Sequence, residues 1–222
     1  YETLEAYARK VETRVDKKTR VETRTIISSP DELAAATLEG FTVTEDMLGN
    51  YSQTTYGRTA PSRSSEETPD GLYHLHFVPK KLTREVSAVL HIEGLNNIRS
   101  ATCRLGGVAE SIFLATGKTS ANTVTQEFTP SNPEFSPGSP FNGTLSCEFE
   151  IFGLNVIDNN NLHLDALLVD GKTEFEGDCT NVKITENDDG TGSVTLILEA
   201  STEKVPDVKP EGGAGSGFDV DV

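Results

Sequence analysis

The chain has 222 residues, of which 35% are hydrophobic and none is tryptophan. This lean composition allows one large or two small domains and predicts thin layers, as in a β-sandwich, instead of a deep α/β enzyme core. The formal net charge of −16 excludes nucleic acid as an expected partner, because an acidic surface repels phosphate backbones.

The first 24 residues differ in charge from the rest of the chain. They hold seven basic and five acidic side chains, and the motif VETR occurs twice, at 11–14 and 21–24. A solvated edge strand or loop is one interpretation of this pattern. A protease-sensitive segment is the other, with Arg14 and Arg24 as its candidate cleavage sites.

The rest of the first half is irregular. Residues 20–29 and 71–79 have the composition of strands, and 30–41 predicts either a short helix or a strand followed by a turn. Residues 52–71 are polar with two prolines and predict a long loop. These strands are too few to close a sandwich, so they either pack onto the second half or belong to a domain that is incomplete here.

The second half alternates apolar and polar residues between closely spaced turn signals. This pattern predicts an antiparallel sandwich. The expected strands are 84–94, 98–107, 109–117, 121–130, 144–151, 162–170, 172–177, 180–186 and 193–200. The inward-facing residues expected from two of them are Val86, Ala88, Leu90, Ile92, Leu145, Cys147, Phe149 and Ile151.

The letters GKTS at 117–120 resemble the end of a phosphate-binding loop. Such a loop needs a glycine five positions before Gly117, where the backbone wraps the phosphate, and this chain has Ile112 there. The stretch is better explained as a short strand and a turn that uses Gly117. We therefore expect no nucleotide cofactor.

The histidines give little support for a metal site. His74 and His76 lie two residues apart on an expected strand and could face one side, but no third ligand is evident nearby. His91 and His163 are isolated within strands and are expected to be structural.

Cys103, Cys147 and Cys179 lack metal-binding spacing, and their odd number argues against a complete disulfide framework. Buried free thiols are the expectation. No motif of a nucleophilic hydrolase, a zinc protease or a reactive cysteine occurs. We therefore predict a protein that is not an enzyme, with no catalytic, cofactor-binding or metal site.

Residues 82–118 resemble the opening of the second domain in Bacteroidetes fimbrillin-type proteins, the anchor-like and minor subunits of type V pili. The similarity lies in four motifs, namely LTREV at 82–86, GLNNI at 94–98, LGGVA at 105–109 and FLATG at 113–117. Residues 162–171 and the end of the chain resemble the same family.

The resemblance implies tandem transthyretin-like, Greek-key β-sandwich domains. We expect an N-terminal domain over 1–79, a C-terminal domain over 80–205 and a Gly-rich tail over 206–222. Residues 1–14 resemble the middle of the family's first domain, so the N-terminal sandwich is expected to be incomplete. The family also implies export as a lipoprotein of the outer membrane, through an N-terminal lipid anchor that we expect to lie outside this chain.

Members of this family assemble by donating a strand to an open groove of a neighbour. The resemblance therefore implies a fimbrial anchor or accessory subunit whose partners are other fimbrial subunits. Phe218, Val220 and Val222 alternate with aspartates and are the candidate assembly strand.

Two other functions stay open on the residues alone. A glycan-binding module would need clustered exposed aromatic side chains, for which Tyr51, Tyr56 and Tyr73 are the candidates. A hydrolase would need paired carboxylates across a cleft, which the sequence alone does not place.

Overall fold

The computed structural model describes residues 4–15, 22–43, 75–155, 160–188 and 194–210. Their regular structure is β-strand, apart from the short 3-10 turn η2 (Leu95–Asn97). The chain is therefore all-β, as predicted. In this described part we find no helix with the length and apolar character needed to cross a bilayer.

The chain divides into two compact units. The main unit combines Tyr1–Ala34 with Lys81–Val222, and the inserted unit is Ala35–Lys80. The predicted boundary near residue 79 lies beside the second junction, but the first 34 residues group with the C-terminal half. The first 34 residues therefore pack with the second half of the chain.

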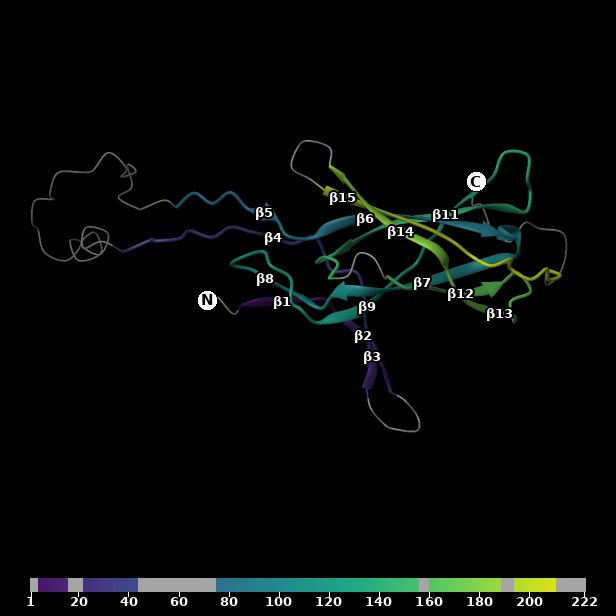
Figure 1. The fold of residues 1–222 in the computed structure, drawn as a ribbon, viewed down its shortest axis with the longest axis horizontal. Coiled ribbons are helices and arrows are strands. Elements are labelled where there is room, and N and C mark those ends of the chain that lie inside the picture. The colour runs from purple at the N-terminus through teal and green to yellow at the C-terminus, as the bar shows by residue number, and fades with distance from the viewer. Residues whose placement is uncertain (1–3, 16–21, 44–74, 156–159, 189–193, 211–222) are drawn as a thin grey trace, which may run out of the picture. The chain divides into compact units, whose positions relative to one another are not determined.

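One layer of the main unit is a five-stranded sheet (Figure 1). Its order is β10 (Asn132–Phe135), β11 (Asn142–Ile151), β6 (Arg84–Glu93), β15 (Val194–Ser201) and β14 (Thr180–Asp188). Strands β15 and β6 run parallel, and the other neighbours are antiparallel. No strand was predicted where the β10 edge lies, and Pro133 there fits an edge strand, the position in a sheet that proline tolerates.

The second layer is a six-stranded sheet. Its order is β13 (Glu174–Asp178), β12 (Leu162–Leu168), β7 (Ile98–Ala109), β9 (Thr123–Phe128), β3 (Glu22–Ile27) and β2 (Lys10–Val15). Strand β3 joins β9 in parallel, but only through Ile26 and Ile27. The β2–β3 hairpin therefore projects beyond the rest of the sheet (Figure 1).

One apolar core lies between the two layers and draws on both sheets. The alternation predicted for β6 and β11 is confirmed, because seven of the eight expected side chains are buried and Cys147 is partly buried against them. The other large fully buried core residues are Leu95, Ile98, Leu105, Leu162, Leu164, Leu168 and Leu198.

The N-terminal segment ties both sheets together. Strand β1 (Glu5–Tyr7) pairs with β8 (Ser111–Phe113). A small apolar cluster of Ala109, Ile112 and Phe152 is covered there by Ala6, Ala8, Leu33 and Leu82. The Ser29 hydroxyl accepts a hydrogen bond from the Glu150 backbone N–H at 3.0 Å, so the segment also contacts the end of β11.

The helix considered for 30–41 is absent, and the strand-and-turn alternative holds. Strands β4 (Ala34–Ala35) and β5 (Lys80–Lys81) form a two-stranded sheet. The Leu82 N–H donates to the Leu33 carbonyl at 2.7 Å, so the backbone pairs laterally instead of along a helix. Isolated helices of this length are only marginally stable in water, which explains why the segment pairs with another strand instead. The strand expected over 71–79 is also missing from its described residues, 75–79.

The GKTS stretch folds as a turn after β8. The Gly117 N–H donates to the Phe113 carbonyl at 2.8 Å, and the Phe113 N–H donates to Lys118 at 2.8 Å. Gly117 has φ +66°, a left-handed conformation that favours glycine. The strand-and-turn interpretation is therefore confirmed.

Candidate functional site

A network of charged side chains lies on the outer face of the six-stranded sheet. In β12 the even-numbered residues point into the core, from Leu162 to Leu168. Successive side chains of a strand point to opposite faces, so His163 and Asp165 point outward. Arg104 of β7 lies on one side of them and Glu176 of β13 on the other.

Arg104 is the most enclosed member of the network, with 11% of its side chain exposed. Its Nε lies 3.2 Å from Glu127 Oε2 on β9, and its guanidinium also contacts Asp165 Oδ2 on β12. Arg104 lies directly opposite Glu127 on one side and His163 on the other, so Asp165 is its diagonal neighbour, two residues further along β12. This one cation joins three adjacent strands by charge-assisted hydrogen bonds.

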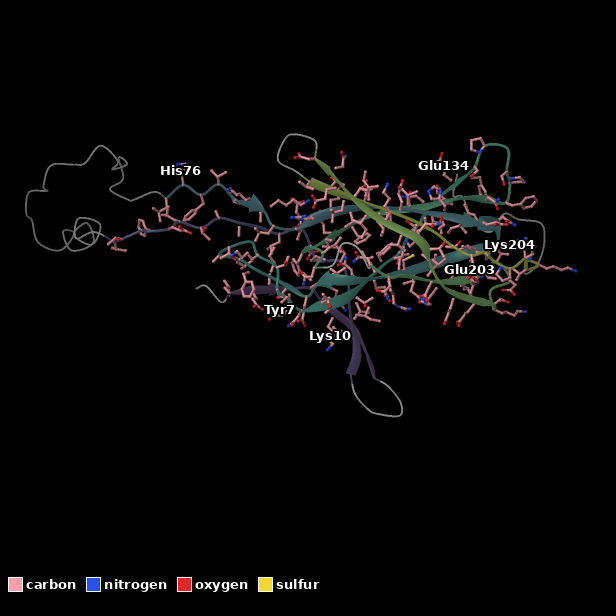
Figure 2. All side chains as sticks on the ribbon, viewed as in Figure 1. Tyr7, Lys10, His76, Glu134, Glu203 and Lys204 are labelled. Atoms are coloured by element: carbon pink, nitrogen blue, oxygen red, sulfur yellow. The ribbon has the colours of Figure 1, made fainter. Side chains whose placement is uncertain are left out.

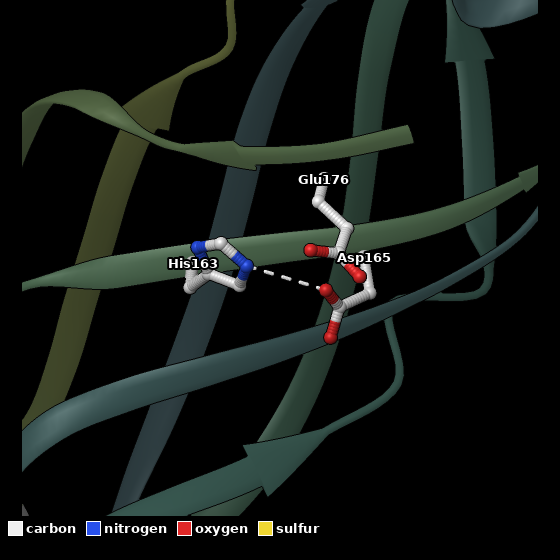
Figure 3. A group of neighbouring side chains, drawn as sticks. All are labelled: His163, Asp165 and Glu176. Atoms are coloured by element: carbon white, nitrogen blue, oxygen red, sulfur yellow. Dashed lines mark ion pairs between the residues drawn. The ribbon is translucent and has the colours of Figure 1, made fainter. Parts of the chain in front are cut away.

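His163 lies between two carboxylates, those of Asp178 and Asp165. Its Nδ1 is 2.8 Å from Asp178 Oδ1, and its Nε2 is 3.2 Å from Asp165 Oδ1. Figure 3 shows the His163 ring and the Asp165 and Glu176 carboxylates pointing toward one another. One ligand atom from each of these three residues lies within 4.8 Å of the others.

The charges of this network suit the binding of a cation. The network holds four carboxylates (Asp165, Glu176, Asp178 and Glu127), one guanidinium and one imidazole, so its net charge is negative in either protonation state of the imidazole. The adjoining cavity, lined by Asp165, Leu167 and Glu174 among others, has about 180 Å³. That volume is below the roughly 300–1,000 Å³ of typical organic-ligand pockets.

The sheet edges are a second candidate, for protein contacts. Strand β14 is the longest edge strand, with nine residues. It pairs with β15 on one side, and within the described part of the chain no strand pairs with its other side. Val182 and Ile184 are half-buried against the core. An unpaired edge of this kind can accept a further strand.

The profile of a family described as "Domain of unknown function (DUF5119)" matches residues 1–129. The chain belongs to the DUF5119 family. The matched part ends just after β9, so it includes Arg104 and Glu127 but not the β12–β13 hairpin that carries His163 and Glu176.

No curated protein matches this DUF5119 chain. Among solved structures, it is similar to the crystal structure of a "putative adhesin from Bacteroides ovatus", with a TM-score of 0.48 and 14% sequence identity. The similarity covers 80% of this chain and 56% of that one, so this chain spans little more than half of that protein.

The structure describes some of the predicted site residues of the DUF5119 chain and not others. Arg14 and Arg24 lie directly opposite each other in the β2–β3 hairpin. Phe218, Val220 and Val222 lie outside the described residues, as do Tyr51, Tyr56 and Tyr73. His74 is also outside them, and His76 is exposed in the inserted unit (Figure 2).

Sequence reasoning missed the group around His163. That histidine was interpreted as structural, whereas the structure places it in a charged network with residues of two other strands. A signal was present in the sequence. His163 and Asp165 are two residues apart in one strand, so both point outward, and after the next turn acidic residues occupy every second position of 174–178. Pairing these two strands in register would have brought the acids opposite the histidine.

Proposed function

We propose that this chain is a non-enzymatic anchor or accessory subunit of a cell-surface fimbria of the type V pilus class. It acts in pilus assembly and adhesion through β-strand contacts with other fimbrial subunits. The four motifs at 82–86, 94–98, 105–109 and 113–117 support this class, because their combination resembles fimbrillin-type proteins.

The observation that carries the proposal is the open edge at β14. The other edge strands have four (β10), five (β13) and six (β2) residues, against nine in β14. A bulge near Asn181, whose φ is +53°, interrupts the pairing with β15, and 183–188 then continues in regular register. A donor strand would find its longest regular template along these residues.

The proposed assembly uses both ends of the chain. Phe218, Val220 and Val222 supply the alternating apolar side chains of a donor strand for a neighbour. Arg14 and Arg24 are cleavage sites in the hairpin that covers the edge of β9. The tandem transthyretin-like architecture and export as an outer-membrane lipoprotein, with its lipid anchor outside this chain, belong to the same proposal.

Fractionation of surface filaments tests this function. Fimbriae are sheared from the producing bacterium, purified and probed with an antibody against this chain. We expect the chain in the filament fraction, and we expect loss of residues 206–222 to reduce incorporation while the protein still reaches the surface. Fimbrial subunits should be recovered with it after mild crosslinking.

Two outcomes contradict the proposal. Saturable binding on a glycan array, together with absence from filaments, would identify a glycan-binding module instead. Turnover of a polysaccharide by the purified chain would show that it is an enzyme.

A further inference from the structure

We propose that His163, Asp165 and Glu176 bind a divalent cation of the Zn²⁺ class on the outer face of the six-stranded sheet. The site is independent of the fimbrial role proposed above. It joins β12 to the edge strand β13, and its ligands come from two neighbouring strands in register.

The charges on β12 and β13 favour a cation between the two strands. Asp165 and Glu176 are directly opposite each other across the β12–β13 pair. Like charges at such positions destabilise a sheet. Arg104 contacts Asp165 through Oδ2, on the side of β7. For Glu176 the described residues provide no hydrogen bond or ion pair, so a cation between the two carboxylates would remove an uncompensated repulsion.

The two ring nitrogens of His163 face different carboxylates. Nδ1 lies 2.8 Å from Asp178 Oδ1, and Nε2 lies 3.2 Å from Asp165 Oδ1. In the tautomer that donates from Nδ1 to Asp178, the Nε2 lone pair would be available to a cation shared with Asp165. A carboxylate that accepts from the second ring nitrogen is the usual support of a metal-binding histidine.

The ligand set and spacing favour Zn²⁺ over Ca²⁺ or Mg²⁺. One imidazole nitrogen with two carboxylate oxygens suits a first-row transition metal, whereas the alkaline-earth ions prefer oxygen ligands alone. Tetrahedral bonds of about 2.0–2.1 Å place ligand atoms roughly 3.3 Å apart. The Nε2 to Oδ1 distance of 3.2 Å meets this spacing, and the exposed Glu176 can rotate to complete it. The fourth position is open to water.

The test is titration of the tag-free chain with ZnCl₂, followed by calorimetry and thermal unfolding. We expect about one Zn²⁺ per chain. At a free concentration near 100 times Kd, we expect Tm to rise by about 5–10 °C. MgCl₂ and CaCl₂ at the same concentration should leave Tm unchanged.

Two pairs of matched variants locate the site. Glu176→Gln should abolish the Zn²⁺-dependent rise in Tm, whereas Glu174→Gln, the same change on the same face of the same strand, should retain it. His163→Ala should abolish binding and His91→Ala, on the other sheet, should retain it. Absence of saturable Zn²⁺ binding overturns the proposal, and so does an equal loss in the Glu174→Gln or His91→Ala control.

Discussion

Phe128 stacks on Phe149 across the core, with ring centroids 4.3 Å apart and ring planes within 16°. Phe128 belongs to β9 of the six-stranded sheet and Phe149 to β11 of the five-stranded sheet. The contact therefore joins the two layers directly. Aromatic pairs of this kind add to the stabilisation from burial of their area.

Removing one ring of this pair should weaken the whole sandwich. We expect Phe149→Ala to lower the free energy of unfolding by about 3–5 kcal/mol, through lost burial and a residual cavity. Phe141→Ala is the control, because Phe141 is 60% exposed and should change stability by less than about 0.5 kcal/mol. Urea unfolding measures both. Equal effects would show that the stacked pair does not hold the layers together.

The strand pattern of the second half could be predicted because each central strand places one face on the core. Val86 to Ile92 on β6 and Leu145 to Ile151 on β11 show the alternation that half-buried strands require. Local signals do not specify which distant strands pair. The parallel pairings of β15 with β6 and of β3 with β9 join segments that are remote in sequence, and neither was predicted.

The candidate site was harder to predict for the same reason. Asp165 and Glu176 become neighbours only through the register of β12 on β13, and Arg104, which contacts Asp165, comes 61 residues before it in the chain. Taken separately, each residue is an ordinary polar side chain on a solvated strand face. Only their juxtaposition creates the charged network.

Arg104 and Arg84 provide a matched comparison of ion pairs. Arg104 has 11% of its side chain exposed and serves two carboxylates, whereas Arg84 is 48% exposed and pairs with Glu186 at the surface. We expect Arg104→Met to cost about 1–2 kcal/mol, because two partly enclosed carboxylates lose their cation. Arg84→Met should cost less than about 0.5 kcal/mol. Thermal unfolding at low and high salt distinguishes them, and similar costs would contradict the bridging role of Arg104.

Two features favour glycine at position 94, in the GLNNI motif. The backbone has a positive φ, and there is no room for a side chain. The φ of Gly94 is +88°, and a Cβ there would lie 2.8 Å from the Val205 carbonyl oxygen. Gly138 has φ +78° with nothing within 4 Å of an added Cβ. We expect Gly138→Ala to cost about 1 kcal/mol from backbone strain alone. Gly94→Ala should cost about 1–3 kcal/mol more, from overlap with the chain at Val205. Equal losses of stability would show that crowding at Gly94 is unimportant.

The cysteines should react slowly in the folded protein. Burial raises the pKa of Cys147 and of Cys179 to about 11, and it raises the pKa of the Cys103 thiol well above its ordinary value. Because the thiolate is the nucleophile, we expect little alkylation by iodoacetamide at pH 8 and rapid alkylation of all three in urea. Mass spectrometry of the labelled chain measures this, and rapid native labelling would contradict it.

The same thiols make stability depend on pH in the alkaline range. An unfolded cysteine loses its proton near pH 9, whereas folded Cys147 and Cys179 keep theirs until about pH 11. Their contribution to the free energy of unfolding is therefore fully present below pH 9 and falls between pH 9 and pH 11. The Cys147→Ala and Cys179→Ala double variant should lose part of this slope in urea unfolding at each pH. An unchanged slope would assign the dependence to other groups.

The β2–β3 hairpin should be an early target of an arginine-specific protease. Its β3 strand is joined to β9 only through Ile26 and Ile27, whereas Arg84 and Arg104 lie in long strands of the two central sheets. We expect cleavage at Arg14 or Arg24 long before cleavage at Arg84 or Arg104, as measured by intact mass over time. Cleavage at Arg24 followed by loss of β1 would uncover the cluster of Ala109, Ile112 and Phe152, and the fluorescence of an added hydrophobic dye should rise.

The Arg14→Gln and Arg24→Gln double variant is the control for this cleavage. It should lose the fragments that end at these two positions and should delay the rise in dye fluorescence. Both effects follow if the segment that carries β1 covers the apolar cluster, because this segment is held at β8 by a short pairing of three residues once its connection through β2 is cut. First cleavage at Arg84 or Arg104 would show that the hairpin is as well protected as the central strands.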